Sequence, residues 1–297
     1  MKYTINEFRR DYPNDDVCLD MIFKLRYAKM PCCPQCSQES NFKRITGRRC
    51  YQCADKDCQY QLYPTAGTVF EKTRVSLVDW FYVIYLIGST RNGVSAKEIQ
   101  RQLGVTYKCA WRMGHQIRTL MANGGLTEML SGTVEADETY IGGKNKNMHK
   151  SRRDKMNENG TGTINKMPVL TLLERGGRIV TKVVDEGTMK TIIPFVKGNV
   201  EAGTRLITDG HGAYRALAGY MSHEVVNHLQ DEYVRPGNIH TNTVEGFFSH
   251  LKRTIGGTHI HVSKKHLEKY ANECSFRYTH RDEGQLMFHR ILKQVVQ

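Results

Sequence analysis

The sequence predicts an α/β fold, a mixed five-stranded sheet with flanking helices, preceded by a small metal-binding module and a helical pair. Three observations support this prediction. From Gly132 onward the hydrophobic period changes from helical to alternating. The alternating runs are joined by short turns or helical stretches, and most of the nine cysteines crowd within residues 32–58. At 297 residues, the chain has room for about two domains.

The charge balance of the chain predicts an anionic partner. Lys and Arg outnumber Asp and Glu by 43 to 30, a formal net charge of +13. Nucleic acid is the commonest partner of such a basic chain, with ribosome-like or membrane-surface roles as competing interpretations. A hydrophobic fraction of 39% argues against general disorder. The polar start predicts no signal peptide, and the longest apolar run, 77–87, is too short for a membrane span.

Residues 1–75 are predicted to form a short helical lead and a zinc ribbon. Cys33 and Cys36 make a C-x-x-C turn, and Cys53 and Cys58 make a second, looser one. Four thiolates on two turns suit tetrahedral zinc, which can supply the folding energy that so short a segment lacks. Cys50 with Cys53 is the tighter alternative, but a closing strand after Cys58 favours the looser pair. A cluster of buried free thiols is the competing interpretation.

Residues 76–125 are predicted to form a DNA-binding helix-turn-helix. Ser76 can cap a first helix, and Ser95 with Glu98 makes a capping box at the start of the next. After a turn at 104–106, one helix carries basic side chains at three- and four-residue steps, namely Lys108, Arg112, His115 and Arg118. Helix, glycine-containing turn and basic helix are typical of DNA-binding modules, although an ordinary helical hairpin has the same pattern.

Residues 130–262 are predicted to form the sheet domain, followed by helices over 263–297. The strand-like runs are 133–141, 167–175, 178–185, 204–209 and 223–228. The turn at 176–177 makes an antiparallel hairpin, and the helical crossovers make the later strands parallel to the first. This is the ribonuclease-H-like arrangement, in which the first and fourth strands are central neighbours. The basic stretch before the second strand, 144–166, is predicted to be a mobile loop.

This topology places acidic residues together. Asp137 and Asp209 each end a strand-like run, and Glu245 lies on the amphipathic helical stretch 240–253. Oxygen-only ligands select Mg²⁺ or Mn²⁺, and two such ions about 3.5–4 Å apart can activate a water or a 3′-hydroxyl. Lys252, two helical turns after Glu245, is expected to meet a phosphate as a point charge.

Other residues near these acids keep alternatives open. Glu135 and Glu138 are rivals of Asp137 for the same role. His211 and Asn242 are candidate helpers. Each acid taken singly can also be a turn or surface residue, so the prediction depends on the whole set in this order on this fold.

These motifs resemble a known family. The segments CPQC, PTAGTVFEKT, VEADETYIGGK, TDGHGAY and HTNTVEGFFSHLKR resemble bacterial insertion-sequence transposases with an N-terminal zinc ribbon and a DDE catalytic domain, the group related to the Merlin superfamily. The resemblance covers nearly the whole chain. It implies binding of terminal inverted repeats, and metal-dependent strand cleavage and transfer into target DNA.

The resemblance also implies roles for particular residues and partners. Asp137, Asp209 and Glu245 form the catalytic triad and hold two Mg²⁺ or Mn²⁺ ions, one zinc is structural, and Lys252 and Arg253 contact DNA. The partner is double-stranded DNA, bound by a homodimer or higher oligomer in the bacterial cytoplasm, at the nucleoid. The C-x4-C spacing departs from the commoner C-x-x-C, which keeps Cys50 as an alternative zinc ligand. Some relatives use Asn at the metal site, which keeps Asn242 as a candidate contributor there. A domesticated DNA-binding regulator and a nuclease of the same fold are the rival functions.

Overall fold

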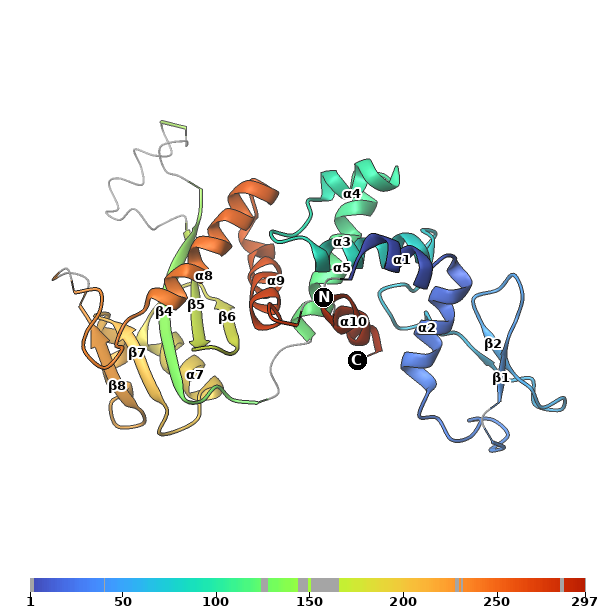
Figure 1. Cartoon of the computed structure of the whole chain (residues 1–297), viewed down its shortest axis with the longest axis horizontal. Coiled ribbons are helices and arrows are strands. Elements are labelled where there is room, and N and C mark those ends of the chain that lie inside the picture. Colours follow the sequence, from blue (N-terminus) through green and yellow to red (C-terminus); the bar gives the residue numbers. More distant parts are fainter. Residues whose placement is uncertain are drawn as a thin grey trace. The chain divides into compact units, whose positions relative to one another are not determined.

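The computed structural model describes residues 3–39, 41–123, 128–143, 149–150, 166–227, 230, 232–283 and 286–296. Most of the predicted basic loop, residues 144–148 and 151–165, lies outside the described residues. The chain divides into two compact units: unit 1 comprises residues 1–123 and 283–297, and unit 2 comprises residues 124–282. The helical stretch predicted over 263–297 is therefore divided between the two units (Figure 1).

Unit 1 begins with two helices and a small antiparallel sheet. These elements are α1 (Ile5–Asp11), α2 (Asp15–Tyr27), β1 (Phe42–Arg44), β2 (Tyr51–Cys53) and β3 (Gln61–Leu62). Helix α1 starts with a capping box, in which Thr4 and Glu7 satisfy each other's backbone N–H groups. The Phe23 ring of α2 stacks on Tyr51 of β2 with centroids 3.9 Å apart. This contact packs the helix against the small sheet.

The rest of unit 1 is a helical module. It contains α3 (Leu77–Ser89), α4 (Ala96–Leu103), α5 (Tyr107–Asn123), α10 (Leu286–Lys293) and the 3₁₀ helix η6 (Gln294–Val296). The Ser76 and Ser95 side chains accept hydrogen bonds from the third residue of α3 and α4, which confirms both as N-caps. The predicted capping box at Ser95 is not completed, because the Glu98 carboxylate accepts from Arg101 and Gln102 instead. Gly104, at φ +67°, ends α4, and a three-residue connection leads into α5. Helix α10 approaches α3 closely at Gly88, where an added Cβ would lie 3.5 Å from the Phe288 backbone nitrogen.

Unit 2 is built on a five-stranded mixed sheet, as predicted. Its strands are β4 (Thr133–Gly142), β5 (Lys166–Glu174), β6 (Ile179–Val183), β7 (Arg205–Asp209) and β8 (Ser222–Val226). The spatial order is β6-β5-β4-β7-β8 (Figure 1). Strands β4, β5 and β6 pair antiparallel, whereas β7 and β8 run parallel to β4. The first and fourth strands of this sheet are therefore neighbours, which confirms that part of the prediction.

Helices cover the two faces of this sheet. They are α7 (Met189–Asn199), the 3₁₀ helix η2 (Gly212–Leu217), α8 (Asn242–Arg253), the π-helical turn η4 (Thr254–His259), the 3₁₀ turn η5 (Lys264–His266) and α9 (Leu267–Thr279). Leu170 and Leu172 of β5 join the core with α7 and η2, and the alternate residues Val169 and Leu173 join the core with α8 and α9. The two helix groups therefore lie on opposite faces. No helix among the described residues is both long and apolar enough to cross a bilayer.

Candidate functional site

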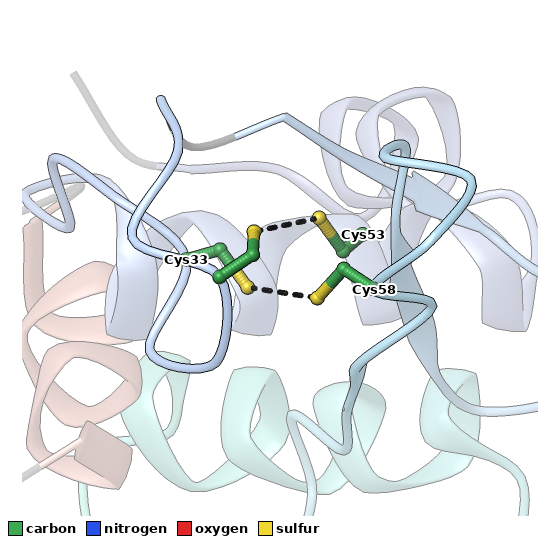
Figure 2. A group of neighbouring side chains, drawn as sticks. Cys33, Cys53 and Cys58 are labelled. Carbon is green, nitrogen blue, oxygen red and sulfur yellow. Dashed lines mark hydrogen bonds between the residues drawn. The ribbon is translucent and has the colours of Figure 1, made fainter.

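Four cysteines of unit 1 form a compact cluster. Cys33 and Cys36 lie before β1, Cys53 ends β2, and Cys58 lies beyond it (Figure 2). The Cys33 and Cys58 sulfurs are 3.7 Å apart, those of Cys36 and Cys53 are 3.9 Å apart, and all four lie within 4.8 Å of one another. Sulfurs bound at about 2.3 Å to a tetrahedral zinc lie ~3.8 Å apart. The cluster therefore has the dimensions of a structural zinc site.

The cluster decides between the two cysteine pairings that the sequence left open. Cys50 is fully buried and does not belong to the cluster. Across the residues that the structure describes, these four cysteines are the one group of three or more potential metal ligands with atoms so close together. The looser pair, Cys53 with Cys58, is therefore the pair that faces Cys33 and Cys36.

Strand pairing brings the two aspartates of unit 2 together. Strands β4 and β7 are parallel, and their register pairs Ala136 with Thr208. Asp137 and Asp209 are the next residue on each strand, so they lie side by side on the same face of the sheet. The alternation along β4 assigns that face. Ala136 packs in the core beneath α7, whereas Asp137 points to the side covered by α8.

Glu245 comes to the same face from the first turn of α8. Its carboxylate is exposed and accepts a hydrogen bond from Thr241 Oγ1 at 3.3 Å. Burial raises the pKa of Asp137 to about 8, and the negative charges of Asp209 and Glu245 add to this effect. Asp209 and Glu245 are thus both within electrostatic reach of Asp137, although the three acids do not form a group of potential ligands as compact as the four cysteines.

The two rival acids have other partners. Glu138 points to the opposite face, where it accepts a hydrogen bond from Tyr214 Oη at 2.8 Å and lies 3.4 Å from His211 Nδ1. Glu135 is fully buried and forms an ion pair with Arg175, Nε to Oε1, at 2.7 Å. Strand periodicity alone could have separated Glu138 from Asp137, because consecutive strand residues face opposite sides. No local sequence pattern indicates that Glu135 pairs with Arg175, which follows forty residues later.

The predicted DNA contacts and candidate helpers of unit 2 lie on its surface. Lys252 and Arg253 are exposed in the last turn of α8, and Asn242 is exposed at its first residue. The backbone N–H of His211 donates to Asp209 Oδ1 at 3.0 Å.

On α5, only part of the predicted basic face is on the surface. Lys108 and Arg112 are exposed. His115 and Arg118 are 5% and 3% exposed, so the prediction that they present side chains to DNA is not supported by this structure. The His115 ring lies against Trp111, with centroids 3.8 Å apart, and an added Cβ on Gly114 would meet Arg118 Nη1 at 3.0 Å. The missing side chain of Gly114 leaves the space that Arg118 occupies.

The raised pKa of Asp137 predicts how stability depends on pH in protein that holds zinc but no added Mg²⁺. A carboxyl with a pKa of about 8 in the folded state, against an ordinary value of 3.8, favours folding while it is protonated. That contribution is lost progressively as the pH rises from about 4 to about 8, with a slope of at most about 1.4 kcal/mol per pH unit, and changes little at higher pH. We therefore expect thermal unfolding midpoints to fall from pH 6 to pH 9, and to fall less in Asp137→Asn. Parallel profiles for the two proteins would contradict the environment assigned to Asp137.

Comparison with known proteins identifies two matching families. Residues 129–279 match the family described as the ISXO2-like transposase domain, and residues 13–61 match the transposase zinc-ribbon domain. An uncharacterised protein of transposable element ISH50 from Halobacterium salinarum is 29% identical over 269 residues, covering 87% of this chain and 88% of that protein. An uncharacterised transposase-like protein of Haemophilus influenzae is 26% identical over 121 residues, covering 40% of this chain and 94% of its own.

The chain also resembles a solved structure, though only weakly. It is the cryoEM structure of a simian T-cell lymphotropic virus intasome in complex with a PP2A regulatory subunit, with 12% identity and a TM-score of 0.30. The match covers 61% of this chain and 63% of that one, less than two thirds of its length.

The family assignment therefore depends on the sequence matches. The zinc-ribbon match covers all four clustered cysteines, and together these findings support a structural zinc. The transposase-domain match covers just over half of the chain, including the whole sheet of unit 2. The chain belongs to the ISXO2-like transposase family and carries that family's zinc ribbon.

Proposed function

We propose that this transposase binds the terminal inverted repeats of an insertion sequence and catalyses metal-dependent DNA strand cleavage and strand transfer. In this proposal unit 2 is a ribonuclease-H-like DDE domain with Asp137, Asp209 and Glu245 as its catalytic acids. One observation carries the proposal: two aspartates lie on adjacent parallel strands, beneath the helix that bears the glutamate. The net charge of +13 agrees with a nucleic-acid partner.

The donor set fits Mg²⁺ or Mn²⁺. The three acids offer only carboxylate oxygens, which hard divalent ions prefer. Their mutual repulsion, part of what raises the pKa of Asp137, is what a bound cation relieves. Two ions, when bound, would supply activation of a water or 3′-hydroxyl and stabilisation of the leaving oxygen.

Each residue of the site has its own part. Asp137 and Asp209 hold one side of the site from the sheet, and Glu245 closes it from α8. Lys252, exposed seven residues after Glu245 on the same helix, offers a positive charge to a phosphate. Arg253 beside it adds a second cation, and its Nε donates to the Ser249 carbonyl at 3.2 Å.

The proposed reading head is the start of α5. Helix α4, the turn at Gly104 and helix α5 follow one another as in a helix-turn-helix, whose second helix presents its N-terminal residues to the major groove. We expect Lys108→Ala and Arg112→Ala to reduce the preference for terminal-repeat DNA over random DNA by about 1–3 kcal/mol for each base pair that the variant no longer reads. Competition binding at fixed salt measures this preference.

A matched control separates base contacts from general charge. Lys190 is exposed at the start of α7, on the sheet face opposite α8, and Lys190→Ala should leave the preference unchanged. Equal weakening of both DNAs by the α5 variants would mean phosphate contacts instead.

The proposed activity is tested with the purified, zinc-loaded protein, DNA carrying the element's ends and a target plasmid, in Mg²⁺. Cleaved ends joined to the target are the expected products, formed by a homodimer or higher oligomer on the DNA. Cleavage without joining would indicate a nuclease of the same fold. Binding without cleavage would indicate a DNA-binding regulator, and either result would overturn the proposal.

A further inference from the structure

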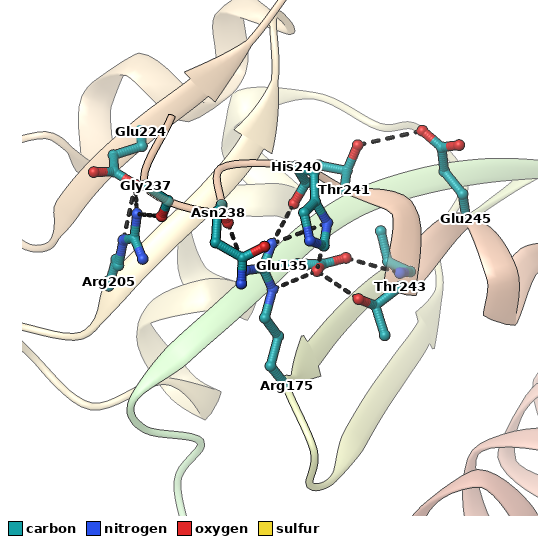
Figure 3. A network of polar contacts seen from close by, with 11 residues as sticks. Glu135, Arg175, Arg205, Glu224, Gly237, Asn238, His240, Thr241, Thr243 and Glu245 are labelled. Atoms are coloured by element: carbon teal, nitrogen blue, oxygen red, sulfur yellow. Dashed lines mark hydrogen bonds and ion pairs between the residues drawn. The ribbon is translucent and has the colours of Figure 1, made fainter. Parts of the chain in front are cut away.

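A polar cluster around one buried carboxylate holds the first turn of α8. We call it the Glu135 clasp: Glu135, Arg175, His240, Thr243 and the backbone N–H of Val244 (Figure 3). Glu135, 0% exposed, accepts hydrogen bonds from Arg175 Nε and Thr243 Oγ1, each at 2.7 Å, and from the Val244 N–H at 2.9 Å. Each carboxylate oxygen has at least one of these donors, and no surface of the side chain reaches solvent. Glu135 is thus placed to hold protein groups and not a metal ion.

Arg175 extends the clasp to the segment that leads into α8. Its Nη1 donates to the Asn238 carbonyl at 2.6 Å, and its Nη2 donates to the His240 carbonyl at 2.7 Å. The same Nη2 lies 3.1 Å from His240 Nδ1. A planar guanidinium holds several acceptors in one fixed geometry, which a lysine cannot reproduce.

A second arginine holds the same segment from β7. Arg205 donates from Nη2 to the Gly237 carbonyl at 2.8 Å and from Nε to Glu224 at 2.8 Å. Gly237 and Asn238 are both left-handed, at φ +85° and +59°, so the segment turns sharply here. The approach to α8 is therefore tied to β4, to the end of β5 and to β7, the strands that frame the two aspartates.

The clasp links Glu245 to Asp137 by a short path. Glu135 lies two residues before Asp137 on the same face of β4, about 7 Å along the strand. Glu135 also accepts a hydrogen bond from the backbone N–H of Val244, the residue immediately before Glu245. A buried carboxylate at the N-terminus of a helix is also favourably placed for the helix dipole. The position of the glutamate relative to the aspartates therefore depends on these hydrogen bonds.

We propose that Glu135, Arg175 and Thr243 are positioning residues that set the place of Glu245 opposite Asp137 and thereby the affinity of the site for a divalent cation. This inference rests on the proposed metal-dependent function. Mg²⁺ demands near-ideal octahedral geometry at about 2.0–2.1 Å, so a small shift of one carboxylate weakens binding. Loss of a partner that orients a ligand typically costs about 10–100-fold in metal affinity.

Thr243 offers the cleanest test, because valine has nearly its shape and lacks the hydroxyl. Mn²⁺ binding to the full-length, zinc-loaded protein without DNA is followed by the electron paramagnetic resonance of free Mn²⁺. We expect Thr243→Val to weaken Mn²⁺ binding by about 10-fold. Thr243→Ser, which keeps the donor, should restore most of the affinity.

The matched control is Thr181→Val. Thr181 and Ser275 share a buried hydroxyl hydrogen bond of 2.8 Å in the same unit, where β6 meets α9. This variant should lower the thermal unfolding midpoint without changing Mn²⁺ affinity. If it weakens Mn²⁺ binding as much as Thr243→Val does, the effect is general destabilisation and the positioning role is wrong.

Two further variants keep the outcomes distinct. Asp137→Asn should lose the Mn²⁺ site; if it does not, the proposed catalytic site fails, whatever Thr243→Val shows. If Asp137→Asn loses the site but Thr243→Val binds Mn²⁺ like the wild type, only the positioning inference fails. Should Thr243→Val not fold, Arg175→Lys replaces it. Lysine keeps the charge beside Glu135 but loses the forked donors, so unchanged affinity in that variant would also overturn the inference.

Discussion

Replacing Asp137 or Asp209 with Asn, or Glu245 with Gln, is expected to abolish DNA cleavage in Mg²⁺ while leaving DNA binding largely intact. Each change removes a ligand charge and almost no volume. Because these groups are proposed to touch the ions directly, the loss should exceed the roughly 10–100-fold that follows removal of an outer partner. Cleavage of DNA carrying the element's ends measures the activity, and fluorescence anisotropy measures binding of the same DNA.

The chain provides a neighbouring control for this set. Glu138→Gln makes the same change of charge one residue from Asp137, on the opposite face of β4, and keeps an acceptor for Tyr214 Oη. We expect this variant to cleave DNA. Near-wild-type cleavage by any of the three triad variants would remove that residue from the ligand set. Inactivity of Glu138→Gln would mean that the assignment of faces is wrong.

Cys58→Ser is expected to abolish zinc binding by unit 1 and to unfold its zinc ribbon. The strands there span only three, three and two residues, and so small a sheet is marginal without further support. Zinc binding supplies apparent free energies of about 10–16 kcal/mol in comparable small modules. Elemental analysis should find one zinc per chain in the wild type and little in Cys58→Ser.

Cys50→Ser is the matched control for the zinc prediction. Cys50 is fully buried, whereas Cys58 is partly exposed. Packing alone would therefore make the Cys50 change the more damaging of the two. Retention of zinc in Cys50→Ser and its loss in Cys58→Ser would separate ligation from packing. The reverse result would contradict the four-cysteine assignment.

The sheet was predictable because its order depends on short-range signals. Gly176, at φ +72°, allows the tight turn that makes β5 and β6 a hairpin. The helical stretch before β7 forces a crossover, so β7 runs parallel to β4. Once these two strands are neighbours, Asp137 and Asp209 must be adjacent. The four cysteines that cluster were likewise predictable from local spacing and the strand that follows Cys58.

What the sequence did not predict depends on contacts between distant segments. Glu135 looked like a rival catalytic acid, because its partner Arg175 lies forty residues away and nothing local announces the pairing. His115 and Arg118 looked like surface cations, because a basic residue on a helix usually is one. Burial of Arg118 needs the space left by Gly114. A glycine within a helical stretch does not by itself predict that a neighbouring side chain will be buried over it.

Unit 1 is assembled from two segments that the ribosome makes at different times. Phe288 of α10 packs against Tyr12 and Phe81, with ring centroids 5.5 and 6.2 Å away, yet all of unit 2 is synthesised between them. At about 5–20 residues per second, this intervening stretch takes roughly 8–32 s to translate. Throughout that interval the apolar side of α3 lacks the helix that packs against it, so chaperones can bind the nascent chain there. Unit 2 can finish folding first, so a chain released before residue 286 would carry the proposed catalytic acids but lack α10, whose Phe288 packs on unit 1.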